Sequence, residues 1–446
     1  MIFRLIILFL ILPGAARAAE FGVTLKAAED SALASSNQYK SAKFSAEAAK
    51  AGAAAAGTLL YPRLSLEGSL RYNEVVPTIA MPAALGGARP LGDNWNYSIG
   101  PTAYWTLDAG TLRSGREFAR KTAAARTSEA ENARRQALLK ARSSYFQLQL
   151  ALEKVYLIGQ NLQVSLSQLK DMELGVKAGA RSRLDGIRAR QETTARRRDL
   201  LRARAELSSA LLDLSFVTGL ELPFSPGLPL DARMAGKDYG GEINPGLLVR
   251  AEAYEELLPR LLPAAEGKMG KALPAVVALA ETAAAYRAAA SAQKAERLPR
   301  LTLSARGSVD YPNGPNLYSF LQGSAGLSLN MPLFESGRLA ERETESRLGA
   351  EAASERREEA VRAASRDFSR ALDSYNALME EQAINIDALD DAEEAAKLAY
   401  AAYKTGSGTW LEVESANLKA LQAKTTAAST NAEILIKLAL LDSLSD

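Results

Sequence analysis

Residues 298–303 read LPRLTL, and residues 61–66 read YPRLSL, which is nearly the same pattern earlier in the chain. From Gly110 onward the separation between matching positions is constant, so that Gly110 matches Gly337 and Lys177 matches Lys404. Changes of length are confined to the stretch before Gly110, where a surface loop would accept them. The sequence therefore predicts two copies of one structural unit.

Each copy contains two segments in which apolar and polar side chains alternate. These segments are residues 62–73 and 94–107 in the first copy, and residues 299–311 and 318–332 in the second. Alternation with a period of two over ten or more residues predicts β-strands. Each predicted strand has one apolar face and one polar face.

Each copy also contains a long helical hairpin, at residues 114–218 and 338–444. Residues 114–176 contain no Pro, so they can form one helix about 90 Å long. Apolar residues recur in steps of three and four from Tyr145, and the same phase returns at Leu372, the matching position of the second copy, as coiled-coil packing requires. A shorter helix, at about residues 25–57, precedes the first strand.

The first residues of the chain have the features of a secretory signal peptide. Residues 1–18 combine a basic start at Arg4, an apolar run at residues 5–12 and a small-x-small motif that predicts cleavage after Ala18. An uncleaved anchor is the alternative. The apolar run is too short, however, to span about 30 Å of hydrocarbon as a helix.

One further segment has no counterpart in the other copy. Residues 219–271 are interrupted by several Pro and Gly residues, which are typical of loops and turns. We interpret this segment as the connection between a first repeat, residues 19–218, and a second repeat, residues 272–446. A short helix is predicted within it at about residues 247–262.

The chain of 446 residues has no Cys and no His, and its formal net charge is +2. These absences exclude disulfides, thiol chemistry, and metal sites or general bases that use histidine. A hydrolase with a pair of carboxylates is an alternative function. It would need a cleft that raises one pKa, whereas the acidic residues are scattered along helix surfaces. We therefore expect no enzyme, no cofactor and no metal site.

One segment is dense in arginine and can be interpreted as a nucleic-acid-binding helix. It is interleaved with Glu192, Asp199 and Glu206, and a secreted chain would not meet a genome. We expect a solvated or ion-paired outer face and no nucleic-acid partner. The arginines are Arg181, Arg183, Arg188, Arg190, Arg196, Arg197, Arg198, Arg202 and Arg204.

The strands decide how the mature chain can enter a membrane. No later segment has the run of about 20 uncharged apolar residues that a membrane helix needs, so a spanning part has to be β-structure. Lipid accepts β-structure as a closed barrel, and four strands cannot close. Two chains would supply eight strands, whose barrel is filled by side chains or holds one small ligand. Three chains would supply twelve strands and an open lumen.

Aromatic side chains near the predicted strand ends support the membrane interpretation, because interfacial girdles belong there. The alternative is a soluble antiparallel sandwich, within a periplasmic coiled-coil scaffold that does not enter the membrane. The signal peptide, the long coiled coils and the repeat together favour the barrel. The aromatic residues are Tyr72, Trp95, Tyr97, Trp105, Tyr311, Tyr318 and Phe320.

This order of elements resembles the TolC-like family of outer-membrane efflux proteins. In the second copy the resemblance is carried by residues 298–301 (LPRL), 327–337 (LSLNMPLFESG) and 402–406 (AYKTG). The first copy has weaker versions at residues 105–110 (WTLDAG) and 176–179 (VKAG). The resemblance covers the mature chain apart from the connecting segment.

The resemblance implies a mainly α-helical, TolC-like fold with a membrane β-barrel portion and two repeats of helix, two strands, long helix and helix. It also implies a homotrimer with a twelve-stranded barrel in the outer membrane of a Gram-negative bacterium and a coiled-coil tunnel in the periplasm. Its partners would be membrane lipid, a periplasmic adaptor (membrane fusion) protein and an inner-membrane pump of the RND or ABC type. Its function would be passive efflux or type I secretion, driven by the pump.

The resemblance assigns two sites. The helical tips would contact the adaptor; the alternative is that they are ordinary turns between helices. The periplasmic entrance of the family carries two acids three residues apart. Glu412 matches the first and Ser415 stands at the second, with Asp185 equivalent to Glu412 in the first copy, so a complete double acidic ring is not expected. Alternatively, Asp185 and Glu412 are helix N-terminal acids favoured by the helix dipole. The tip residues are Gly179, Ala180, Arg181, Gly406, Ser407 and Gly408.

Overall fold

The structure is a computed structural model that describes residues 21–82, 84, 87–108, 110–222 and 249–445. The predicted signal peptide and its cleavage site after Ala18 lie outside the described residues, as do residues 223–248 of the predicted connection. The chain divides into two units. The helical unit contains residues up to 39, 133–273 and from 363 onward, and the sheet unit contains residues 40–132 and 274–362.

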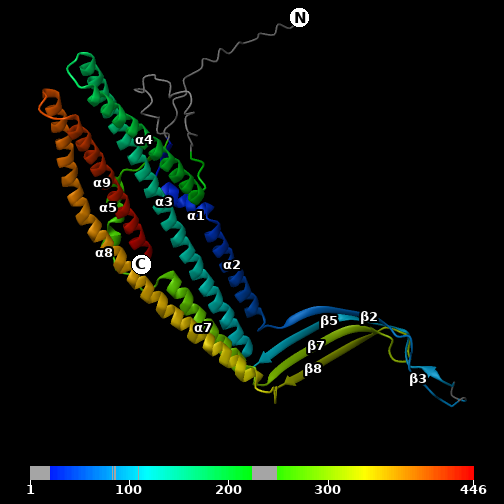
Figure 1. Cartoon of the computed structure of the whole chain (residues 1–446). Helices are drawn as coiled ribbons and strands as arrows, with labels where there is room; N and C mark the ends of the chain where they lie inside the picture. The colour runs from blue at the N-terminus through cyan, green and yellow to red at the C-terminus, as the bar shows by residue number, and fades with distance from the viewer. Residues whose placement is uncertain (1–20, 83, 85–86, 109, 223–248, 446) are drawn as a thin grey trace, which may run out of the picture. The chain divides into compact units, whose positions relative to one another are not determined.

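The helices confirm the internal repeat almost residue for residue (Figure 1). Helices α3 (Thr111–Lys177) and α8 (Arg338–Thr405) begin at matching positions of the two copies, as do α4 (Arg183–Thr218) and α9 (Trp410–Leu444). The earlier helices α2 (Asn37–Thr58) and α7 (Pro274–Ala295) have the larger separation of the YPRL and LPRL motifs that follow them. No helix in the described part of the chain is both long enough and apolar enough to cross a membrane.

The single helix predicted at residues 25–57 is wrong, because the structure has two helices there. Helix α1 (Leu25–Ser35) ends at Ser36, whose backbone is not helical, and α2 begins at Asn37. The hydroxyl of Ser36 accepts a hydrogen bond from the Tyr39 amide at 3.2 Å, and the Ser35 hydroxyl donates to the Val217 carbonyl at 3.2 Å. Serine side chains that bond to the backbone in this way compete with helical hydrogen bonds.

The four predicted strands form one antiparallel sheet in the sheet unit (Figure 1). They are β2 (Arg63–Tyr72), β5 (Trp95–Asp108), β7 (Arg300–Tyr311) and β8 (Phe320–Asn330), in the order β2-β5-β7-β8. The two halves of the chain therefore meet where β5 pairs with β7, and β2 and β8 are the edges. A small additional pair, β3 (Thr78–Ile79) with β4 (Arg89–Pro90), lies between β2 and β5 in the chain.

The register of this sheet gathers the apolar side chains on one face. Trp105, Leu303 and Leu327 are direct neighbours across β5, β7 and β8, and Leu70 lies opposite Tyr97. Large side chains of this face are exposed in the single chain, with 67% of Leu327 accessible. Burying apolar surface is the main favourable term in protein association, so such a face predicts an apolar environment or a partner.

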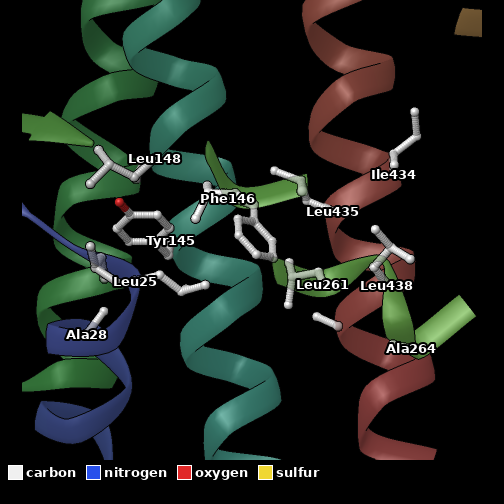
Figure 2. Close-up of a cluster of buried hydrophobic side chains, with 14 of the residues drawn as sticks. Leu25, Ala28, Tyr145, Phe146, Leu148, Leu261, Ala264, Ile434, Leu435 and Leu438 are labelled. Carbon is white, nitrogen blue, oxygen red and sulfur yellow. The ribbon is translucent and has the colours of Figure 1, made fainter. Parts of the chain in front are cut away.

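The core of the helical unit lies where α1, α3 and α9 meet the connecting segment. Tyr145, Phe146 and Leu148 of α3 are fully buried; Tyr145 and Leu148 lie on the side of α3 that faces α1, and Phe146 lies on the side that faces α9, as Figure 2 shows. The Tyr145 hydroxyl donates to the Val23 carbonyl at 2.8 Å and accepts from the Glu252 amide at 2.8 Å. This buried hydroxyl thus acts both as a donor and as an acceptor, and it attaches the segments around Val23 and Glu252 to α3.

The helix predicted at residues 247–262 is shorter in the structure. Residues Val249–Ala251 form strand β6, which pairs in parallel with β1 (Phe21–Val23), and helix α5 occupies Tyr254–Leu261. A four-residue helix, α6 (Pro263–Glu266), follows. The pairing with β1 overrides helix formation at residues 249–251, because it satisfies the backbone groups of both segments.

Candidate functional site

Each helical hairpin of the helical unit turns at a glycine with left-handed backbone geometry. Gly179 has a φ of +73° and Gly406 a φ of +83°. The Gly179 amide donates to the Val176 carbonyl, and the Gly406 amide donates to the Tyr403 carbonyl, each at 3.1 Å. These bonds satisfy carbonyls at the helix C-termini, and only glycine adopts such φ values without strain.

The helices after the turns begin at side-chain caps. The Ser182 hydroxyl accepts from the Leu184 amide at 3.1 Å. Thr409 and Glu412 form a reciprocal capping box, in which the Glu412 carboxylate accepts from the Thr409 amide at 2.8 Å and the Thr409 hydroxyl accepts from the Glu412 amide at 3.4 Å. This arrangement fixes the Glu412 carboxylate at the start of α9.

The predicted adaptor-contact residues differ in accessibility. Gly179, Ala180, Gly406 and Ser407 are exposed, whereas Gly408 and Arg181 are half-buried. The Arg181 guanidinium lies 4.4 Å from the centre of the Tyr403 ring and donates to the Lys404 carbonyl at 2.9 Å. Arg181 therefore connects the first tip to the second, a contact that sequence reasoning missed.

A small apolar core, here called the tip cluster, joins the four helices beside the turns. It contains Met172 of α3, Ala189 of α4, Tyr403 of α8, and Trp410 and Val413 of α9. The Tyr403 and Trp410 rings meet edge to face at 5.3 Å. The Tyr403 hydroxyl donates to the Met172 sulfur at 3.1 Å. Burial raises the pKa of Tyr403, and the nearby Asp185 carboxylate adds to this effect.

Polar contacts tie α3 to α8 next to the tip cluster. The Tyr400 hydroxyl donates to the Asp171 carboxylate at 2.7 Å, and the Lys404 ammonium lies 3.7 Å from the same carboxylate. The Lys404 ammonium also lies 4.7 Å from the centre of the Tyr400 ring. Burial, followed by the hydrogen bond and the charge of Asp171, raises the pKa of Tyr400. Tyr400 falls on the spacing of three and four that continues from Leu372, and this pattern gives no sign that its hydroxyl has a partner on α3.

Further from the tips, polar side chains are buried between α3, α4 and α9. Gln168 accepts a hydrogen bond from the Asn417 side chain at 2.9 Å. Glu192 is only 3% exposed, and neither of its carboxylate oxygens has a hydrogen-bond partner among the described residues. Burial raises the pKa of Glu192, while the charge of Arg196 opposes this shift. A buried carboxylate of this kind destabilises the packing of the surrounding helices whenever it is charged.

The predicted entrance residues lie on the first turns of α4 and α9. Asp185 is half-buried, and Glu412 and Ser415 are exposed on the single chain. Asp185 and Glu412 both occupy the first helical turn, where a negative charge is favoured by the helix dipole. Each acid thus has a local role, and an additional role at an entrance remains a prediction.

Six of the seven predicted interface aromatics gather at one end of the sheet, where the β2–β5 and β7–β8 connections lie. The Tyr72 and Trp95 rings are 5.1 Å apart, and the Tyr97 and Tyr311 rings are stacked at 5.2 Å. Trp105 lies toward the other end of β5 and donates to the Leu60 carbonyl at 3.1 Å. Phe320 is the first residue of β8, and Tyr318 lies two residues before it.

The arginine-dense segment belongs to α4 and to the turn before it, and several of its members are ion-paired. Arg190 contacts Glu173 at 3.2 Å, and Arg196 contacts Asp199 at 3.0 Å. Arg196 is only 7% exposed, so it does not belong to an outer face as predicted. Within the described ranges no group of three or more acidic side chains is placed to hold a metal ion.

The two tips are held together by noncovalent contacts, and their turns are exposed. Hydrogen bonds, an ion pair and ring contacts hold two hairpins together, and each can break without covalent change. Such an arrangement suits a structure that opens and closes.

The chain belongs to the outer membrane efflux protein family, whose sequence model matches residues 29–220 and 272–445. It is therefore an efflux channel protein of the outer membrane of a Gram-negative bacterium, and it extends into the periplasm. The family is a transport family, and membership sets aside the scaffold alternative. A comparison with curated protein sequences finds no match.

Solved structures share the fold. The chain is similar to VceC of Vibrio cholerae, with 19% identity and a TM-score of 0.71 over 94% of this chain and 95% of that one. It is also similar to the MtrE channel of Neisseria gonorrhoeae, with 20% identity and a TM-score of 0.71 over 97% and 93% of the two chains. The CmeC channel of Campylobacter jejuni gives 14% identity and a TM-score of 0.73 over 94% and 85%. The predicted TolC-like fold class is thus confirmed.

Proposed function

We propose that three copies of this chain combine their sheets into one twelve-stranded barrel that conducts substrate passively across the outer membrane. The observation that carries this proposal is the four-stranded sheet, with β2 and β8 as edges and one face of exposed apolar side chains. Unpaired strand edges are costly in lipid, and closure between copies removes them. Twelve strands leave a lumen, whereas eight would be filled by side chains.

The proposal extends to the organisation of the chain. A first repeat (residues 19–218) and a second repeat (residues 272–446) each contribute one β-hairpin and one helical hairpin, and residues 219–271 connect them. A signal peptide at residues 1–18 directs export. The aromatic residues at the strand ends, Tyr72 and Trp95 among them, lie at the membrane interfaces.

The tips are the proposed docking surface for a periplasmic adaptor protein, which connects the channel to an inner-membrane pump that supplies the energy. The glycine turns and their exposed neighbours, such as Ala180 and Ser407, favour contact with another hairpin because their small side chains allow close approach. Asp185, Glu412 and Ser415 are the proposed entrance residues. The ties between Tyr400 and Asp171 and between Arg181 and the second tip would hold this entrance closed.

The proposal can be tested on the mature chain in its native host. Membranes are washed with high salt and then extracted with detergent, and the mass of the purified protein is measured by light scattering corrected for detergent. We expect extraction by detergent alone, a particle of three chains, and discrete conductance steps in planar bilayers. Release by salt, or a monomer in water without detergent, would refute the channel.

A further inference from the structure

The polar face of the sheet carries every charged residue of its four strands. Successive residues of a strand point to opposite faces, so Leu64 and Leu301 lie on the apolar face and the residues before them, Arg63 and Arg300, lie on the polar face. In the proposed barrel the apolar face meets lipid, and the polar face therefore lines the lumen. The charged residues are Arg63, Glu67, Arg71, Asp108, Arg300, Arg306 and Asp310.

Acidic residues of this face are bonded to neighbouring donors. The Asp108 carboxylate accepts hydrogen bonds from the Gly110 amide at 3.2 Å and from the Leu112 amide at 2.9 Å, at the start of α3. The Asp310 carboxylate accepts from the Ser98 hydroxyl at 2.5 Å. These carboxylates are therefore held by groups other than the arginines at the starts of the strands.

Arg63 and Arg300 have no such partners. Both side chains are exposed, and within the described ranges neither guanidinium takes part in a hydrogen bond or an ion pair. Arg297, three residues before Arg300, is instead paired with Glu343 at 2.6 Å. The fold thus compensates a neighbouring arginine and leaves the charges of Arg63 and Arg300 available to a ligand.

The two arginines occupy matching positions of the internal repeat. Each follows a proline, Pro62 or Pro299, and each is the first residue of its strand, β2 or β7. Proline cannot donate a hydrogen bond to a neighbouring strand, so each strand begins directly after it. Figure 1 shows both strands starting at the end of the sheet that joins the helices.

The register of the sheet is compatible with one common level for the two arginines. On β5, Arg300 lies opposite Asp108, whereas Arg63 lies opposite Tyr104, four residues earlier. The strands of a barrel are tilted against its axis, so residues at the same level on different strands are staggered in register. With matching positions of the two repeats at one level, three copies alternate Arg63 and Arg300 around the lumen.

We propose that Arg63 and Arg300 of the three copies form a ring of guanidinium groups in the lumen, where the barrel joins the helices, and that this ring selects anionic substrates. The proposal rests on the proposed barrel of three copies and adds the class of substrate. Two arginines and one Asp108 from each copy leave the ring with a net positive charge. Rings of Arg or Lys favour anions in pores, and the planar guanidinium matches carboxylate and phosphate groups.

Tripolyphosphate, a small polyvalent anion, tests the ring in planar bilayers when it is added to each side in turn. We expect it to block the current through the natural channel, and we expect the variant Arg63→Gln/Arg300→Gln to weaken this block severalfold. The matched control Arg63→Lys/Arg300→Lys keeps the charges and should keep most of the block. Each single glutamine variant removes half of the arginines and should give an intermediate block.

Two further measurements check that charge is the cause. The reversal potential in a gradient of potassium chloride should shift toward potassium in Arg63→Gln/Arg300→Gln and stay unchanged in Arg63→Lys/Arg300→Lys. Because salt screens exposed charges, the block by tripolyphosphate should also weaken as the ionic strength rises. A block that does not depend on salt would contradict recognition by the ring.

The conductance steps themselves separate the possible failures. A natural channel that shows discrete steps but no block by tripolyphosphate, or an equal block in the natural channel and the glutamine variants, would overturn the arginine ring and leave the proposed function intact. Absence of conductance steps in the natural protein would overturn the proposed function itself.

Discussion

The hydroxyl of Tyr400 on α8 donates a 2.7 Å hydrogen bond to the carboxylate of Asp171 on α3, and thus joins two helices that belong to different halves of the chain. Lys404 reinforces this link from one turn further along α8. Because the pair is exposed, this hydrogen bond contributes about 0.5–1.5 kcal/mol, which is large enough to bias the proposed equilibrium between closed and open tips.

Replacement of Tyr400 by Phe should therefore favour open tips. The change removes the hydroxyl and keeps the ring, so packing against Lys404 is retained. We expect Tyr400→Phe to raise single-channel conductance or open probability severalfold in planar bilayers. Tyr375→Phe, at a buried position on the same helix, serves as the control. Identical traces for the two variants would show that the tie does not control opening.

Replacement of Glu412 by Gln tests the entrance assignment without loss of the helix cap. Glutamine can keep the reciprocal bond to the Thr409 amide, whereas alanine would lose a cap worth about 1 kcal/mol. We expect Glu412→Gln to weaken block of the channel by divalent cations severalfold at unchanged thermal stability. Glu414→Gln is the control on the neighbouring position. Unaltered cation block in Glu412→Gln would remove this residue from the entrance.

Buried Glu192 predicts a pH-dependent stability. Its pKa is raised in the folded state, so folding favours the protonated form. Stability should therefore increase as the pH falls from above the raised pKa toward 4.5, the ordinary value, and then stay level with respect to this group.

Glu192→Gln should remove that dependence and stabilise the protein at pH 7, by about 1.4 kcal/mol for each unit by which burial raises the pKa. The measurement is the thermal unfolding midpoint at pH 7 and pH 5, followed by circular dichroism. Glu173→Gln, at a half-buried site, provides the comparison. A lower midpoint for Glu192→Gln at pH 7 would contradict the prediction.

The two faces of the sheet predict opposite responses to a new charge. Leu327 lies on the apolar face and Ser328 on the polar face of the same strand. Leu327→Arg places a charge in contact with lipid, which costs about 2–4 kcal/mol near the middle of a membrane. We expect loss of assembled protein from outer-membrane fractions for Leu327→Arg and near-normal amounts for Ser328→Arg. Equal amounts of the two variants would show that the apolar face does not meet lipid.

Replacement by alanine should destabilise the protein at a turn glycine and stabilise it at a glycine within a helix. Gly406→Ala forces a side chain into left-handed geometry and should cost about 1–2 kcal/mol. Gly52→Ala, within α2 and with open space where the new Cβ would lie, should instead stabilise by about 0.5–1 kcal/mol. Thermal unfolding of the two variants measures the difference, and a stabilising Gly406→Ala would contradict the turn geometry.

Most of the fold could be predicted from the sequence, because its elements have regular periods. Strand alternation and the three-four spacing from Tyr145 are local patterns, and the constant offset between the two copies indicated hairpins of equal length. The break at Ser36 could not be predicted in this way. It depends on hydrogen bonds from serine side chains, one of which reaches the Val217 carbonyl at the end of α4.

The site was less predictable, because its contacts join residues that lie far apart in the chain. The glycine turns and the T-x-x-E cap at Thr409 are local motifs that a sequence displays. The tie between Asp171 and Tyr400 has no local signal, since each residue fits an ordinary helix position. The burial of Glu192 and Arg196 also has no local signal, because both lie in the part of α4 that is dense in charged residues.

The two tips, although alike in backbone, present different chemistry: Ala180 and the partly engaged Arg181 on one, and Ser407 and Gly408 on the other. In a ring of three copies, six tips would alternate between these two kinds. An adaptor that recognises only the shape of the turn would have six equivalent binding sites on the trimer. An adaptor that recognises the Arg181 guanidinium would have three. The stoichiometry of the docked complex therefore reports which property of the tips has been recognised.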